Sequence, residues 1–232
     1  MSVRRWSGLV VAVALALGGV TACGSKSASD LGDPATVLKT AEQKLEDTSG
    51  VTLTLTTDNL PDGVQGVQGA SGTVTDAPAF DGTLTAVTSA GSFPVPIKAV
   101  GGKVYAQIPL TFGWSDVDPG DYGAPDPAQL LSADQGIPAI LAATTDVKKG
   151  DDVRGGKDNK EVLTTYTGNV PESAAAHLIP GATGDFTATY GITADGELRT
   201  AELTGTFYAG KPSMTYTMTV DDYGTSKDIT AP

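Results

Sequence analysis

The sequence is poor in cysteine, histidine, aromatic residues and positive charge. Its one cysteine is Cys23, so no disulfide can form within the chain and the fold must rest on its apolar core. Its one histidine, His177, falls in a short predicted helix, where a structural or exposed role is commoner than a catalytic one. Lys and Arg number 15 against 27 Asp and Glu, and a chain this acidic repels the phosphates of nucleic acids.

The first residues instead carry the pattern of a lipoprotein export signal. A short basic start, Arg4 and Arg5, precedes an apolar run at residues 9–17 that is too short to span a bilayer permanently. The four residues Val20-Thr21-Ala22-Cys23 then read as a bacterial lipobox, in which small side chains flank the cut and the cysteine thiol accepts a diacylglyceryl unit. We therefore expect residues 1–22 to be a signal peptide, exported by a route that the sequence leaves open.

Cleavage before Cys23 would leave a lipid anchor on the outer face of the cytoplasmic membrane. Residues 23–32 are small and polar, which predicts a lipidated flexible tether, and residues 33–232 have the length of a single domain. Loss of Arg4 and Arg5 would take the net charge from −12 to −14. Because anionic lipids repel such a chain, its membrane attachment is expected to come from the lipid anchor. No later segment is apolar and long enough to cross a membrane as a helix.

Strand patterns dominate the predicted domain. Asp33-Pro34 begins an amphipathic helix, and period-two alternation then predicts strands over residues 51–108, with a short sixth strand at Phe112 and Trp114. Short helices are expected at residues 130–131, 137–141 and 172–178, with strands resuming over 147–167 and 186–220. The fold class is therefore α+β: a long, curved, mostly antiparallel sheet, a half-barrel, with helices packed on one face and a gap between them.

The sequence offers no convincing metal, cofactor or catalytic site. Asp116, Asp118, Asp121 and Asp126 cluster, but they lack the alternating acidic loop with its closing Glu that calcium sites use. Pro119 and Pro125 stiffen this segment, so a rigid acidic loop is the expectation. Neither an enzyme nor a cofactor is predicted.

A family resemblance adds to this interpretation. The segment Asp118-Pro119-Gly120-Asp121-Tyr122-Gly123-Ala124-Pro125-Asp126-Pro127-Ala128, followed by Leu130-Leu131 and Asp134-Gln135-Gly136-Ile137, resembles the central segment of the LppX/LprG (LppX_LprAFG) family of actinobacterial, mycobacterial-type cell-envelope lipoproteins. The order of elements along the chain is also similar. The resemblance implies that sheet and helices enclose an apolar cavity that holds multi-acyl lipids or glycolipids, which the protein carries or presents across the cell envelope. Whether it does so with a membrane lipid transporter stays open.

Candidate cavity residues follow from the apolar stripes, because an acyl-chain pocket needs apolar walls and few fixed polar partners. They are Val37, Leu38, Leu53, Leu55, Val95, Ile97, Val104, Ala106, Ile108, Leu131, Ile137, Ile140, Leu141, Phe186, Tyr190, Met214 and Met218. The alternative is that these stripes pack together as a closed core without a ligand. The chain would then be a surface scaffold or interaction lipoprotein.

Overall fold

The computed structural model describes residues 31–232, so the predicted signal peptide and Cys23 lie outside the described residues. The first helix, α1, spans Pro34–Glu46 and begins as the sequence predicts. The Asp33 side chain accepts hydrogen bonds from the backbone N–H groups of Ala35 and Thr36, both at 3.1 Å, which caps the helix. Within residues 31–232 no helix has the length and apolar character that crossing a membrane would require.

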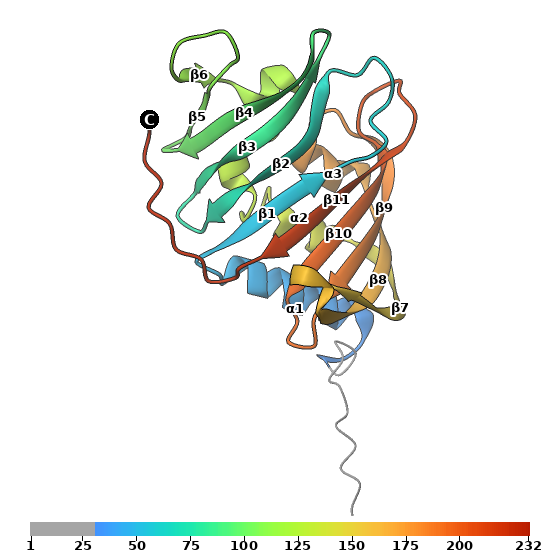
Figure 1. Ribbon diagram of the computed structural model, residues 1–232. Coiled ribbons are helices and arrows are strands. Elements are labelled where there is room, and N and C mark those ends of the chain that lie inside the picture. The colour runs from blue at the N-terminus through green and yellow to red at the C-terminus, as the bar shows by residue number, and fades with distance from the viewer. Residues whose placement is uncertain (1–30) are drawn as a thin grey trace, which may run out of the picture.

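One eleven-stranded sheet forms the body of the molecule (Figure 1). Its order is β6-β5-β4-β3-β2-β1-β11-β10-β9-β8-β7, and all neighbouring strands are antiparallel. Two meanders therefore meet where β1 pairs with β11. The strands are β1 Gly50–Thr56, β2 Gly66–Thr75, β3 Ala79–Thr88, β4 Gly91–Val100, β5 Lys103–Ala106, β6 Ser115–Val117, β7 Thr145–Gly155, β8 Glu161–Val170, β9 Thr183–Ile192, β10 Leu198–Thr206 and β11 Met214–Asp221.

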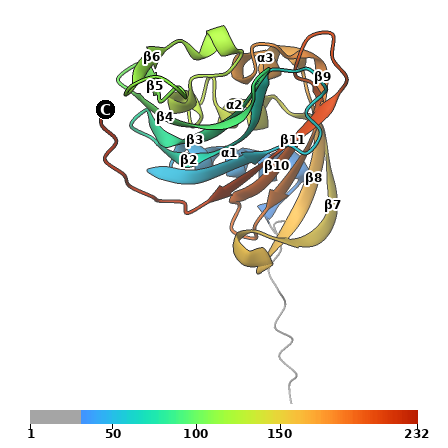
Figure 2. The ribbon, with the colours of Figure 1, turned by 45° about the horizontal axis from the view of Figure 1, so that its top comes forward.

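The helices lie on one side of this sheet, within its curve (Figure 2). After α1 these are α2, Ile137–Ala143, and α3, Glu172–Leu178, with short 3₁₀ helices η2 Pro119–Tyr122, η3 Pro127–Gln129 and η4 Lys157–Asn159 elsewhere in the chain. The expected curved antiparallel sheet with helices on one face is thus confirmed.

Strand alternation sorts the side chains between the two faces of the sheet. In the β1–β11 pair, Leu53 lies opposite Val220 on the inner face, toward the helices. Thr54 lies opposite Thr219 on the outer face. Threonine suits this outer position because it is β-branched yet has a hydroxyl for water. The molecule therefore has one core, between the inner face and the helices.

Three local predictions are wrong. Ile108 is not in a strand, because β5 ends at Ala106 and the chain turns away at Pro109, which has no N–H for a ladder. The sixth strand begins at Ser115, beyond Phe112 and Trp114, because the turn extends through Gly113, which has a φ of 77°. Residues 130–131 follow η3 as a turn rather than a helix, since the Ile137 N–H bonds back to the Leu130 carbonyl.

Candidate functional site

The residues predicted to line a cavity do come together, in the layer between the sheet and the helices. All of them lie in one apolar cluster or pack directly against it. Most are buried, and the partly buried members are Leu55, Ile108 and Met218. Strand register explains the assembly, because Leu55 lies opposite Met218 and Met218 lies opposite Ala201, all on the inner face.

Glycines on the inner face make room for aromatic rings. A Cβ at Gly205 would collide with the ring of Phe186, and one at Gly72 or Gly82 would lie within 2.7 Å of the Phe80 ring. Phe186 then meets Phe207 edge to face with ring centres 4.9 Å apart. The sequence analysis singled out the apolar alternation and missed these glycines. The sequence signal that could have found them is a glycine at an inward-facing position of strands β2, β3 and β10.

The polar groups of this layer are tyrosine hydroxyls. Tyr190 shares a hydrogen bond of 2.8 Å with the Thr144 hydroxyl, and burial raises the pKa of Tyr190 to about 12. Tyr216 donates to the Val67 carbonyl, and burial also raises its pKa.

Tyr166 is 1% exposed and its hydroxyl has no hydrogen-bond partner among the described residues. Burial, followed by the nearby Asp152 carboxylate, raises the pKa of Tyr166. These hydroxyls are therefore neutral at physiological pH.

The interior of the described part of the chain has very little charge. Besides the tyrosines, its buried polar residues are four threonines. Arg199 is 15% exposed and pairs with Glu161 and Glu197, and its Nη1 is buried without a hydrogen-bond partner among the described residues. A site of this kind can hold apolar groups and accept or donate a few neutral hydrogen bonds. It lacks the charges that would fix a phosphate or a metal ion.

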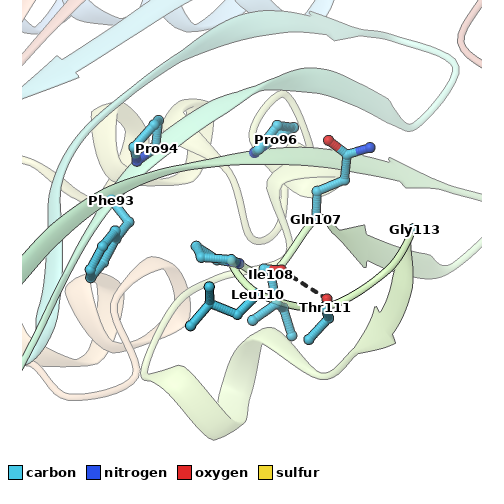
Figure 3. Close-up of a pocket in the computed structure, with 9 residues that line it drawn as sticks. Phe93, Pro94, Pro96, Gln107, Ile108, Leu110, Thr111 and Gly113 are labelled. Carbon is cyan, nitrogen blue, oxygen red and sulfur yellow. Dashed lines mark hydrogen bonds between the residues drawn. The ribbon is translucent and has the colours of Figure 1, made fainter. Parts of the chain in front are cut away.

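Two hollows in the described structure lie outside this layer. The first, of about 490 Å³, lies along the edge of β4 beside the β5–β6 loop, and Ile108 is the predicted cavity residue that lines it (Figure 3). The second, of about 560 Å³, lies at the other end of β4, where the C-terminal segment around Ile229 crosses Gly101 and Gly102. The other predicted cavity residues line neither of these two hollows; they lie in the apolar cluster or pack against it.

The residues that the sequence analysis discounted have ordinary positions. His177 is exposed on α3. Asp118 caps η2 by accepting from the Gly120 N–H at 2.8 Å, and Asp126 caps η3 by accepting from the Ala128 N–H at 2.9 Å. Across residues 31–232 no three His, Cys, Asp or Glu side chains are placed so that they could hold a metal ion together.

A curved open antiparallel sheet with three helices on one face is the architecture of two solved lipoprotein structures. LppX of Mycobacterium tuberculosis aligns with a TM-score of 0.63 and 19% identity, covering 86% of this chain and 100% of its own. LprF of Mycobacterium bovis aligns with a TM-score of 0.69 and 15% identity, covering 90% of this chain and 99% of its own. At these identities the likeness establishes the fold. No curated protein sequence matches the chain.

The family model of the LppX_LprAFG lipoproteins matches residues 33–230, which is nearly the whole of the predicted domain. The chain therefore belongs to the LppX_LprAFG lipoprotein family, as the segment after Asp118 indicated. Membership of a lipoprotein family places it in the cell envelope, in association with a membrane.

Proposed function

We propose that this protein binds multi-acyl lipids or glycolipids between its sheet and its helices and carries or presents them across the cell envelope. The observation that supports this most is the layer itself. It is continuous, apolar and poor in buried charge, and it lies between a sheet and helices from separate segments of the chain. Family membership and the fold shared with two lipoproteins support the same proposal.

Lipid binding by such a layer needs no covalent step, because burial of the acyl chains supplies the free energy. Each methylene that leaves water for an apolar site contributes about 0.8 kcal/mol. An acyl chain that moves from a bilayer to the protein exchanges one apolar surrounding for another, so the net change is small and loading is reversible. We accordingly assign no catalytic step to the protein. Its lipid anchor at Cys23 would keep it at the outer face of the cytoplasmic membrane, where it could exchange lipid with a membrane lipid transporter.

Loading requires space for acyl chains between the sheet and the helices. We infer that acyl chains separate the helices from the inner face of the sheet, since the nine inner strands are hydrogen-bonded to a neighbour on both sides and the helices are not. The unpaired Tyr166 hydroxyl would then meet a polar group of the lipid, such as an ester carbonyl.

Native mass spectrometry on the chain from Gly24 onward, purified from an actinobacterial host, tests this proposal. Every described element lies within residues 31–232, so this chain keeps the whole fold. We expect a discrete bound mass near one lipid per protein, identified after extraction. A bare protein that takes up nothing from lipid extracts would contradict the proposal.

A matched pair of variants on β11 locates the ligand. Met218→Trp fills the inner face with an apolar side chain, whereas Thr217→Trp places the same ring on the outer face of the same strand. We expect the bound mass to fall at least about tenfold in the first variant and to remain in the second, because only the first removes space from the layer. Equal retention in both would place the lipid elsewhere.

A scaffold lipoprotein with a closed core is the second candidate. The observation that favours it is the packing of the predicted cavity residues against one another, with both hollows outside the layer. A chain that stays bare in the mass spectrometer would favour this function.

A further inference from the structure

Two ranges of the sequence have no charge, although the chain as a whole has 27 acidic and 15 basic residues. Residues 82–97 and 104–115 contain no Asp, Glu, Lys or Arg. They form the β3–β4 hairpin end, most of β4 and β5, and the β5–β6 loop, and we call this surface the neutral corner. Lys98 lies opposite Asp81 toward the other end of these strands, and Lys103 pairs with Asp116. The Lys98 Nζ lies 5.9 Å from the centre of the Trp114 ring, at the margin of the neutral corner.

Two large apolar side chains project from the neutral corner into solvent. Leu110 and Phe112, in the β5–β6 loop, are fully exposed, at 105% each. The loop is nevertheless structured, because the Thr111 N–H and hydroxyl both donate to the Ile108 carbonyl, at 3.1 and 2.8 Å. An exposed apolar group held in place on an uncharged surface is typical of a docking site.

The backbone conformation at position 110 of this loop is unfavourable for leucine. Pro109 and Leu110 occupy the central positions of a turn closed by the Thr111 N–H, and Leu110 has a φ of 69°. A turn with proline first and positive φ second is of type II, where glycine or asparagine is usual. A leucine that bears this strain and contacts no core residue points to a use for its side chain outside the molecule.

The hollow beside the loop limits what that partner can be. It is lined by residues of the neutral corner, with Phe93, Pro94 and Pro96 from β4 on one side and Ile108 and Leu110 from the loop on the other (Figure 3). The Pro96 carbonyl faces this edge of β4, where it accepts from the Gln107 N–H. By strand alternation the missing N–H groups of Pro94 and Pro96 would also face this edge. A peptide strand is therefore a poor occupant, whereas an acyl chain needs no hydrogen bonds.

We propose that the neutral corner docks onto a lipid bilayer, with the Leu110 and Phe112 side chains inserted among the acyl chains and the hollow covered by lipid. The rest of this acidic protein is repelled by an anionic membrane, and the neutral corner is the surface that can meet one without that repulsion. This inference rests on the loop and its surroundings, and it extends the proposed carrier function by naming the surface that meets the membrane.

Vesicle binding by the unlipidated chain from Gly24 tests the proposal. In this chain Trp114, at the end of the β5–β6 loop, is the one tryptophan, because the other is Trp6. We expect phosphatidylcholine vesicles to sediment the protein and to shift Trp114 emission to shorter wavelength. Brominated acyl chains should quench that emission. The double variant Leu110→Ser/Phe112→Ser should bind at least about tenfold more weakly, since two exposed apolar side chains no longer leave water.

The matched control is Val162→Ser, which removes an exposed apolar side chain from β8, outside the neutral corner. It should bind vesicles as the parent chain does. Binding should also survive 0.5 M salt, because insertion is not screened as ion pairing is. A double variant that binds as well as its parent, or binding that salt abolishes, would overturn the proposal. So would self-association in the absence of vesicles that requires Leu110 and Phe112, because the occupant would then be a second copy of the chain.

The result is separable from that of the carrier proposal. If vesicle docking fails, a lipid bound between sheet and helices is still detected by mass spectrometry. If the bound lipid is absent, docking through the neutral corner is still measured by sedimentation.

Discussion

Leu110 illustrates a residue whose side chain works against the stability of the fold. Its positive φ costs a non-glycine residue on the order of 1 kcal/mol, and its fully exposed side chain has no packing to offset that cost. The neighbouring contacts of the turn are made by Ile108 and Thr111. The identity of residue 110 is therefore set by something other than folding.

Leu110→Gly tests this separation of stability from function. We expect the free energy of unfolding, measured in urea, to change by less than about 1 kcal/mol. The relief of strain offsets the greater freedom of glycine in the unfolded chain. Vesicle binding should fall in the same variant. As a reference, Leu53→Ala at a buried position should cost about 2–5 kcal/mol. A loss of that size at Leu110 would show that its side chain packs in the fold.

At the scale of elements, strands β2, β3 and β10 each place a glycine beside an aromatic ring on the inner face. Phe80 covers Gly72 and Gly82, and Phe186 covers Gly205 on the neighbouring part of the sheet. Each ring lies close to the backbone because the position beneath it has no Cβ. Overpacking at such a position forces the ring or the strand to move.

Gly205→Ala should therefore destabilise the protein by about 1–3 kcal/mol, measured by urea unfolding. Combining it with Phe186→Leu should recover part of this loss, because a smaller, flexible side chain can yield to the new methyl group. A double-mutant cycle would give a coupling of at least about 1 kcal/mol. Strictly additive effects of the two substitutions would mean that the ring does not rest on Gly205.

Most elements of the fold could be predicted from the sequence, for identifiable reasons. The helix at Glu172–Leu178 and the strands with threonine alternation, such as β1 and β11, agree closely with their predicted ranges. The errors fall where turn geometry decides the structure. The residues after Ala106 continue an apolar pattern, but Pro109 and the positive φ of Leu110 end the strand. Periodicity carries no signal for such a turn when leucine stands where glycine is usual.

At the scale of the whole molecule, the sequence predicted which residues face the interior. It did not predict how closely the helices pack against the sheet. The apolar stripes indicated an inner layer, and the structure places all of its predicted members together. The spacing of a sheet and a helix depends on ring orientation and on glycines such as Gly205, which alternation alone does not reveal. The neutral corner was also missed, because an absence of charge over two separate ranges becomes a surface only when strands β3, β4 and β5 are paired.

The placement of the neutral corner relative to the predicted anchor determines which membrane it meets. The described chain begins beside α1, at the end of the molecule away from the β3–β4 hairpin and the β5–β6 loop (Figure 1). Nine residues lie between Cys23 and Asp33, and the tether of residues 23–32 spans at most about 35 Å. A domain of this size is roughly 40 Å across. With a tether of that length, the corner would face away from the anchoring membrane rather than fold back onto it.

The lipidated full chain in one vesicle population should therefore bridge to a second, protein-free population. We expect vesicle clustering, followed by light scattering and by energy transfer between labelled lipids, that Leu110→Ser/Phe112→Ser abolishes and Val162→Ser leaves unchanged. Inserting about 20 Gly and Ser residues after Cys23 should weaken the bridging, because the corner can then reach its own membrane. Clustering that is indifferent to both the double variant and the tether length would show that the two ends of the molecule do not serve two membranes.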